Sequence, residues 1–498
     1  MKTIPALAIL LAAASSPGSA ALYQGQAAES KYGMGVDSVK VSLRGRPETA
    51  YTDSLGRFSL DLGTTRAGAA RRAPEIVWRG KSRRVSWDAG TGPVAVTVRD
   101  ARGRIEWRGA AAGGAAGSFD LAGLGAGIHF ADLRAGGGQR AWHWYESGDR
   151  GHAPVAVLPE PRDAAFVFPA RASSPLPQPD TSPADTLVFE KKGFETVRMA
   201  VRASGADLMI GLARLPIRVL IIDGMSNHDW RQTTRIAKAV YAKAGFFQVE
   251  VSTAPDRSDA GAWQAWRPDF SRYEMVLLNY NSGDAAGSLR WPADRERELE
   301  AFVRAGGGLY ALHAANNSFP QWAAYNRMIG TGWRRKDFGT ALEVDASGRV
   351  VRIPAGIGGD TGHGARADVL VRLLEPHPIH KGYPPAFLAS TLEIYQYARG
   401  PAEECKVLSY AFDGPASGNS NRSWPIELMA AYGAGEIYNS TMGHVWAGET
   451  LPAAVRDVAF QTALIRASEW LARREVLYPV PKDFNGPERI VYADLDLN

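Results

Sequence analysis

The hydrophobic positions of this chain follow two different periods, and the change between them falls near residue 214. Before that point, short segments such as 39–43 and 57–62 alternate between apolar and polar residues, as strands with one buried face do. After it, apolar residues come in near-continuous runs, such as 218–223, or at helical spacing, as from Ile236 to Ala244. The pattern predicts a multidomain protein: an N-terminal β-sandwich region followed by a doubly wound α/β domain.

The α/β domain is expected over residues 214–482, with residues 483–498 as a C-terminal tail. Strands are predicted at 218–223, 249–251, 275–280 and 309–312, and helices between them end at Gly245 and Gly306. Strand–helix alternation at this spacing is typical of parallel strands joined by helical crossovers. A more β-rich stretch follows over 340–445, and one last helix is predicted from about 453 to 474.

The N-terminal region is predicted to hold one sandwich inserted into another. Residues 35–60 resemble a carboxypeptidase-regulatory-like β-sandwich, and residues 185–196 resemble its later strands. We therefore assign residues 22–64 and 185–213 to that split domain. Residues 94–104 and 121–130 look like parts of an immunoglobulin-like accessory domain, which we place at 65–170. The proline-containing segment 171–184 is expected to be a linker.

The first 20 residues have the form of a secretory signal peptide. Lys2 supplies the positive end, residues 4–14 the apolar core, and Gly18 to Ala21 a small-residue cleavage site near Ala20/Ala21. We therefore expect a secreted or periplasmic protein, with no integral membrane segment. Cys405, the single cysteine, excludes an internal disulfide and is expected to be a buried structural thiol.

The net charge of +5 is small for 498 residues. One arginine-rich run, residues 71–84, is better explained as a solvated strand face, and no nucleic-acid motif accompanies it. We therefore expect no nucleic-acid partner. The oligomeric state is left open by the sequence.

Residues 306–320 are the most informative segment, because they predict a glycine turn, a short buried strand, a sharp bend and a new helix. Ligands of open α/β sheets collect at the carboxyl ends of strands, where such bends lie. Hydrolases carry a nucleophile at a comparable elbow. Here the elbow carries His313, which argues against acyl transfer.

Nine histidines are present, and six of them lie in the α/β region, mostly at predicted strand ends or in loops. His313, His363 and His444, together with Glu393, are the candidate catalytic residues, since imidazole and carboxylate suit acid–base work. The same four are candidate ligands of a divalent metal, although no HExxH motif specifies one. His377 and His380 flank a proline turn and are expected to be structural. For each histidine alone, the plain alternative is that it anchors a loop.

Several ordered motifs resemble the ThuA-like, or trehalose-utilisation, family over about 216–482. They are the loop 227–230, the elbow 312–320 and segments 325–330, 377–379, 393–395, 400–403 and 435–444. The family is similar in fold to class I glutamine amidotransferases, which carry a cysteine at the elbow. Because this chain has His313 there, amidotransferase chemistry is not expected. The resemblance implies carbohydrate metabolism, with links to trehalose and 3-keto-sugar glycosides.

The resemblance and the polar loops together suggest a set of substrate-binding residues. They are Asn227, His228, Asp229, Trp230, Asn316, Asn317 and Tyr395. The segment 227–230 has an alternative explanation, in which Asp229 is the N-cap of the first helix.

The function predicted from the sequence is the processing of a glycoside or keto-sugar by His/Glu acid–base or metal-assisted chemistry. One alternative is a non-catalytic carbohydrate-binding protein whose sandwiches serve for docking. A weaker one is a metal-dependent hydrolase of another small molecule.

Overall fold

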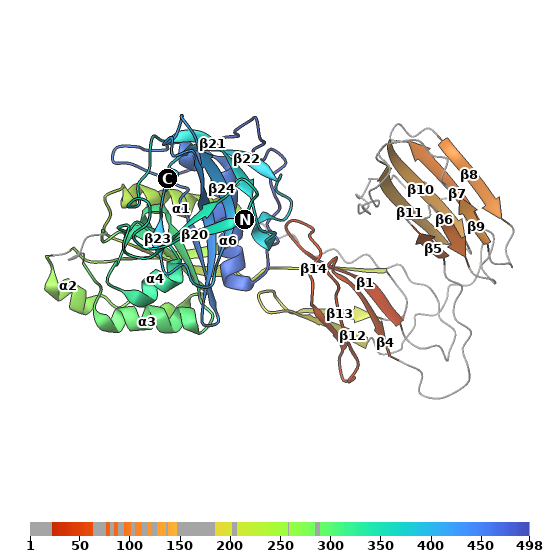
Figure 1. Cartoon of the computed structure of the whole chain (residues 1–498). Coiled ribbons are helices and arrows are strands. Elements are labelled where there is room, and N and C mark those ends of the chain that lie inside the picture. Colours follow the sequence, from red (N-terminus) through yellow and green to blue (C-terminus); the bar gives the residue numbers. More distant parts are fainter. Residues whose placement is uncertain are drawn as a thin grey trace. The chain divides into compact units, whose positions relative to one another are not determined.

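The computed structural model describes residues 22–62, 185–201, 207–256, 258–283 and 289–497, and between 63 and 184 only strands β5 to β11 (Figure 1). The predicted signal peptide and the predicted linker 171–184 lie outside the described residues. The chain divides into two compact units, one formed by its outer segments and the other lying within residues 64–182.

The unit within 64–182 holds two antiparallel sheets. One contains β5 (Ile76–Arg79), β6 (Arg84–Trp87) and β9 (Gly117–Asp120). The other contains β7 (Val94–Asp100), β8 (Ile105–Ala111), β10 (Gly127–Ala135) and β11 (Gly138–Glu146).

Strands from both ends of the N-terminal region share one small core. One sheet joins β1 (Leu22–Glu29), β4 (Arg57–Asp61) and β14 (Asp207–Leu212). The second joins β2 (Lys40–Leu43), β3 (Thr49–Tyr51), β12 (Asp185–Glu190) and β13 (Val197–Val201). Buried Val41, Phe58 and Phe189 pack between these strands. Residues before and after the inserted unit therefore fold together.

The C-terminal region is built on a mixed sheet. Its parallel part has the order β16 (Phe247–Thr253), β15 (Ile217–Asp223), β17 (Met275–Leu278), β18 (Gly308–Leu312) and β26 (Gly435–Ser440). Antiparallel strands β25 (Arg422–Tyr432), β24 (Cys405–Asp413), β21 (Ala367–Leu373) and β22 (Ala386–Leu392) continue it. Strands β19 (Thr340–Val344), β20 (Val350–Ile353) and β23 (Arg399–Gly400) attach at its side.

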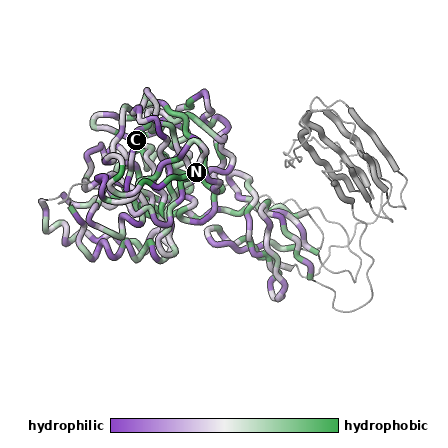
Figure 2. Tube along the Cα trace, viewed as in Figure 1, coloured by the Kyte–Doolittle hydropathy of each residue, from purple (hydrophilic) through white to green (hydrophobic). Residues whose placement is uncertain are grey.

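Helices cover both faces of this sheet. Successive residues of a strand point to opposite sides, and both sides of the central strands are apolar. In β15, Val219 and Ile221 pack with α1 (Trp230–Ala244) and α6 (Val458–Arg473), whereas Leu220 and Ile222 pack with α3 (Ala293–Arg304) and α4 (Ala323–Ile329). Figure 2 shows hydrophilic and hydrophobic residues alternating along α3, as expected of a helix with one exposed face. The predicted α/β architecture is therefore present.

Three local expectations need correction. The last helix is interrupted at Asp457, which caps α6, so that α5 (Ala453–Arg456) is separate. The bend after β18 enters a 3-10 turn, η3 (His313–Asn317), and the α-helix begins only at Ala323. The C-terminal residues expected to form a tail pack onto the domain, with Leu495 buried and the Val458 amide donating to the Val491 carbonyl.

Of the helices in the described part of the chain, none combines the length and the apolarity needed to cross a bilayer.

Candidate active site

A pocket of about 780 Å³ opens at the carboxyl ends of the parallel strands. The loop after β15 contributes Asn227 and His228, and the loop after β17 contributes Asn281. The loop after β26 contributes His444 and Trp446. Strand ends far apart in the sequence thus meet at one edge of the sheet, as is usual for ligand sites in open α/β sheets.

His313, directly after β18, does not line this pocket but is buried against three residues that do, His228, Tyr395 and His444. Its φ of +46° is in the left-handed region, which residues other than glycine rarely adopt. Its Nδ1–H donates to the Thr441 carbonyl over 2.7 Å, and its Nε2 makes no hydrogen bond to the described residues. The residue is only 3% exposed. The strained elbow therefore aims one imidazole nitrogen, with a free lone pair, at the interior of the site.

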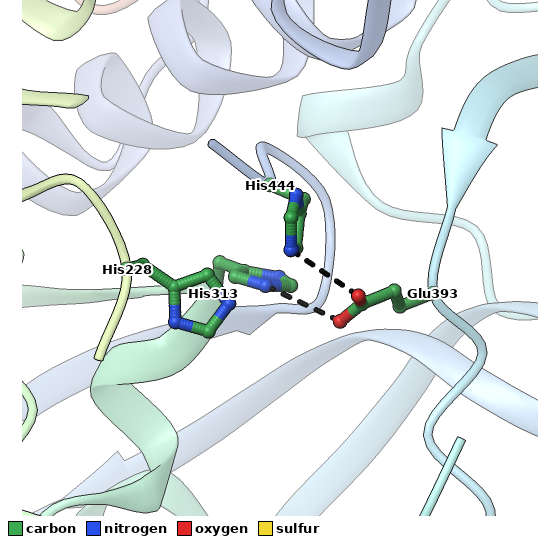
Figure 3. Close-up of side chains that lie close together, drawn as sticks. All are labelled: His228, His313, Glu393 and His444. Atoms are coloured by element: carbon green, nitrogen blue, oxygen red, sulfur yellow. Dashed lines mark ion pairs between the residues drawn. The ribbon is translucent and has the colours of Figure 1, made fainter. Parts of the chain in front are cut away.

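Two further imidazole rings contact His313. The ring centroids of His228 and His444 lie 4.9 and 5.1 Å from that of His313, and 4.8 Å from each other. All three contacts are edge-on. One nitrogen of each ring lies within 4.8 Å of one nitrogen of each of the other two (Figure 3).

Glu393 completes the group from the segment after β22. Its carboxylate oxygens lie 3.2 Å from His444 Nε2 and 3.6 Å from His313 Nε2 (Figure 3). The Nε2 of His363, on the neighbouring loop, lies 3.7 Å from the same carboxylate, and the His363 Nδ1–H donates to the Gly364 carbonyl. Glu393 is thus the residue that links the histidines.

Burial determines the charge state of these groups. It lowers the pKa of His228 and of His444 to about 4, with nearby positive groups adding to the effect. The pKa of His313 lies well below the ordinary histidine value for the same reason. Burial raises the pKa of Glu393, against the attraction of His363 and Arg366. At neutral pH the three rings are uncharged and offer nitrogen lone pairs.

Comparison with known proteins identifies the family. The model of the trehalose utilisation family, ThuA, matches residues 218–471, just over half of the chain. The chain belongs to the ThuA family. The crystal structure of a ThuA-like protein from Parabacteroides merdae is similar at 29% identity and a TM-score of 0.52, over 56% of this chain and 97% of that one. No curated protein matches. Membership supports a role related to sugar metabolism at the level of the family.

Most of the residues predicted from the sequence line the pocket of the ThuA domain: Asn227, His228, Asn317, His363, Glu393, Tyr395 and His444. His313 does not line it, because the residue is buried behind these side chains. Tyr395 is buried beside His313, with ring centroids 5.7 Å apart.

Three predicted substrate-binding residues of the ThuA domain do not line the pocket. Asp229 caps α1, because its carboxylate accepts from the Gln232 amide, so the alternative role predicted for it is the one found. Trp230 begins that helix and packs under the Arg231 guanidinium, 4.1 Å from its ring centroid. Asn316 is buried in the turn and donates to Asn439 Oδ1.

Asn281 and Arg366 are among the pocket residues that were not predicted from the sequence. Asn281 orients Asn227, donating to its Oδ1 over 2.6 Å, and its position just after a buried strand was a usable signal. Arg366 lies near His444 Nδ1 and donates to Glu449, and nothing local in the sequence distinguishes it from other arginines.

The set suited to a metal ion differs from the predicted one by one residue. Four side chains, those of His228, His313, Glu393 and His444, each place one ligand atom within 4.8 Å of all the others. His363, which was predicted to be a ligand, lies beside this group, and His228 stands in its place. His377 packs edge-on against Trp470, and His380 pairs with buried Glu427, away from the pocket lining.

Proposed function

We propose that the ThuA domain is an enzyme that processes a glycoside or a keto-sugar in this pocket. The observation that carries the proposal is the buried carboxylate of Glu393, which meets His313, His363 and His444 within a cavity of ligand size. Family membership supports the sugar class. The convergence of proton-transfer groups supports catalysis over binding alone.

Glu393 and His363 are the best-placed groups for proton transfer. The raised pKa of Glu393 brings the carboxylate nearer to the pH at which it both accepts and releases a proton. His363 is exposed and lines the pocket, so its ring reaches solvent and ligand alike. Such a pair suits removal of the proton next to a sugar carbonyl, followed by loss of the glycosidic oxygen as an alcohol when that oxygen takes up a proton.

Sugar recognition is assigned to the pocket rim. Trp446 is 45% exposed, which is unusual for a tryptophan, and its ring stacks on that of His444 with 5.9 Å between centroids. Its free face suits the apolar face of a pyranose ring. Asn317 offers hydroxyl contacts, because its Oδ1 is buried at the pocket wall and has no hydrogen-bond partner among the described residues.

The test is turnover by the purified full-length protein of a panel of native disaccharides and their 3-keto counterparts, followed by product analysis. We expect product from at least one substrate. Glu393→Gln is expected to lower kcat by roughly 10²-fold or more, the usual size of a general acid–base contribution. Glu343→Gln is the matched control, since Glu343 pairs with Arg422 far from the pocket lining and turnover should be unchanged.

Two outcomes would contradict the proposal, one for catalysis on sugars and one for the role of Glu393. Binding of a sugar by calorimetry without product after long incubation would favour the carbohydrate-binding alternative. Full turnover by Glu393→Gln would remove the carboxylate from the chemistry.

We also propose that the protein acts outside the cytoplasm, on the strength of the signal-like residues 1–20. N-terminal sequencing of the protein from a fractionated native host tests this. A mature chain beginning near Ala21 in the exported fraction is expected, and an uncleaved cytoplasmic chain would contradict it.

A further inference from the structure

We propose that His228, His313, Glu393 and His444 bind one divalent first-row transition-metal ion, of which Zn²⁺ is the representative. The proposed site does not depend on the proposed sugar chemistry, because binding of the ion is measured without any substrate.

The spacing of the four side chains suits a common ion. Bonds of about 2.0–2.1 Å put neighbouring ligands of a tetrahedral ion about 3.3 Å apart. The Glu393 oxygens lie 3.2 Å from His444 Nε2 and 3.6 Å from His313 Nε2. The four ligand atoms lie within 4.8 Å of one another. This limit is longer than the edge of a tetrahedron and is nearer the distance between two ligands on opposite sides of a five- or six-coordinate ion. Ligands on opposite sides of such an ion lie about 4.2 Å apart, so the side chains close by up to about 0.6 Å to hold an ion with five or six positions, some of them left for ligand oxygens.

Two of the imidazoles are already oriented for coordination through Nε2. His313 donates its Nδ1–H to the Thr441 carbonyl, and His228 has Nδ1 2.8 Å from the Asn227 Oδ1. Asn281 donates to the same Asn227 oxygen, which fixes that oxygen as an acceptor and His228 Nδ1 as the donor. Metal-bound histidines are held in this way by an outer oxygen that selects the tautomer.

The unsatisfied nitrogen of His313 is the independent observation. Its Nε2 is buried, points toward Glu393 and makes no hydrogen bond to the described residues. Buried polar atoms are nearly always satisfied, so a missing partner at this point indicates a ligand.

His444 provides the remaining nitrogen. Its Nδ1 lies 3.1 Å from the Arg366 guanidinium and 3.9 Å from the Glu449 carboxylate. The Arg366 guanidinium can only donate, so His444 Nδ1 accepts in this arrangement and Nε2 carries the proton that faces Glu393. Coordination through Nε2 therefore releases that proton, and Nδ1 then takes up a proton and turns from Arg366 to Glu449, which is itself paired with Arg366 at 2.9 Å.

The donor types select the class of ion. Three imidazoles and one carboxylate suit Zn²⁺, Fe²⁺, Co²⁺ or Ni²⁺, whereas Ca²⁺ and Mg²⁺ prefer sets made of oxygens. One carboxylate leaves a net charge of +1 at a divalent ion, which favours an oxygen ligand with negative charge.

The experiment uses the full-length protein without a polyhistidine tag, stripped with chelator and titrated with Zn²⁺ and Co²⁺ by calorimetry. We expect one equivalent of ion, and for Co²⁺ the visible absorption of a site with nitrogen ligands. His228→Ala and Glu393→Gln should each weaken binding by about 100-fold or more, beyond the usual effect of losing a supporting residue. His228 is in a loop and only half-buried, so this variant is expected to fold.

His363→Ala is the matched control, because its ring lies in the same pocket and near the same carboxylate but outside the set. It should keep the ion. Absence of binding in the parent chain, retention of the ion by both test variants, or equal loss in His363→Ala would each overturn the proposal. Failure to turn over sugars would leave it standing, so the two proposals fail separately.

Discussion

At the scale of single residues, the pocket depends on a buried arginine that lies outside its lining. Arg334 is 2% exposed, and its guanidinium donates to the carbonyls of Asn316, Asn317 and Ser318. Its Nε–H donates to Asn326 Oδ1, and Asn326 in turn donates to the Phe319 carbonyl. One side chain therefore holds the carbonyls of the turn that begins at His313.

Arg334→Lys tests this positioning role. An ammonium keeps the charge but cannot reach several carbonyls in one plane. We expect metal affinity and kcat/KM to fall by roughly 10–100-fold, the usual effect of losing an orienting residue. Arg335→Lys, at the exposed neighbouring position that pairs with Asp360, is the control. Equal effects of the two substitutions, measured by calorimetry and initial rates, would contradict the role.

Residue-scale prediction from the sequence succeeded where chemistry coincides with position along the chain. His313 and His444 follow buried strands and were recognisable as strand-end residues, and the structure brings them to Glu393. Arg334 was not predictable. Its partners are main-chain carbonyls, which every residue has, so no side-chain pattern marks it.

At the scale of elements, the loop after β26 has to bring two groups to the site at once. Thr441 orients His313 through its carbonyl, and His444 follows three residues later. Between them Gly443 has a φ of +93°, and a Cβ there would lie 2.5 Å from the Phe460 ring on α6. The loop conformation therefore requires glycine.

Gly443→Ala is expected to shift this loop away from α6 and to separate His444 from Glu393. Strain of this kind costs about 1–3 kcal/mol of unfolding free energy, and more where the new atom clashes. We expect a lower Tm and a loss of metal affinity of more than tenfold. Gly448→Ala is the control, because it also has positive φ, at +85°, but open space around it. A metal affinity reduced equally in both would refute the argument from the loop.

The joint between α5 and α6 makes stability depend on pH. Asp457 accepts from the Ser390 and Ala459 amides and from Asn485 Nδ2, and burial raises its pKa from 3.8 to about 6. A raised pKa means that the folded state binds the proton more tightly than the unfolded one. Its stabilising effect is complete below about pH 4 and is lost as pH rises through 6.

Asp457→Asn removes this titration and leaves an amide facing three donors. The variant should be less stable at pH 7, and the gap to the parent chain should widen by up to roughly 3 kcal/mol between pH 7 and pH 4. Urea unfolding at a series of pH values measures it. Asp494→Asn, at the exposed partner of Arg456, should show a constant gap. A gap that does not change with pH would show that the carboxyl titrates alike in both states.

Prediction of elements succeeded for local patterns and failed for long-range ones. The helix from Trp230 to Ala244 was readable from its apolar spacing and from Gly245, which adopts φ +75° at its end. The antiparallel half of the sheet was predicted only as β-rich. Pairing of β24 with β25, and of β21 with β24, depends on contacts that no local period encodes.

At the scale of the whole molecule, Arg214 ties the first sandwich to the ThuA domain. Its guanidinium lies 3.3 Å from Glu29 on β1 and 2.5 Å from Glu469 on α6. All three side chains are almost fully buried. Nearby, Lys31 Nζ and Tyr32 Oη both donate to the Ala244 carbonyl at the end of α1. These contacts couple the two folds.

Arg214→Met should cost about 3–5 kcal/mol of unfolding free energy, because it leaves two buried carboxylates without the guanidinium that pairs with both of them. Arg349→Met, which removes an exposed pair with Asp345, should cost under about 1 kcal/mol. The guanidinium also lies 4.5 Å from the Phe246 ring centroid, so the effect of the lost charge has to be separated from the effect of lost packing. Adding Glu29→Gln and Glu469→Gln to Arg214→Met removes the stranded charges and should restore most of the loss in urea unfolding. No restoration would assign the cost to the lost contact with Phe246, and the coupling of the two folds would then be apolar rather than ionic.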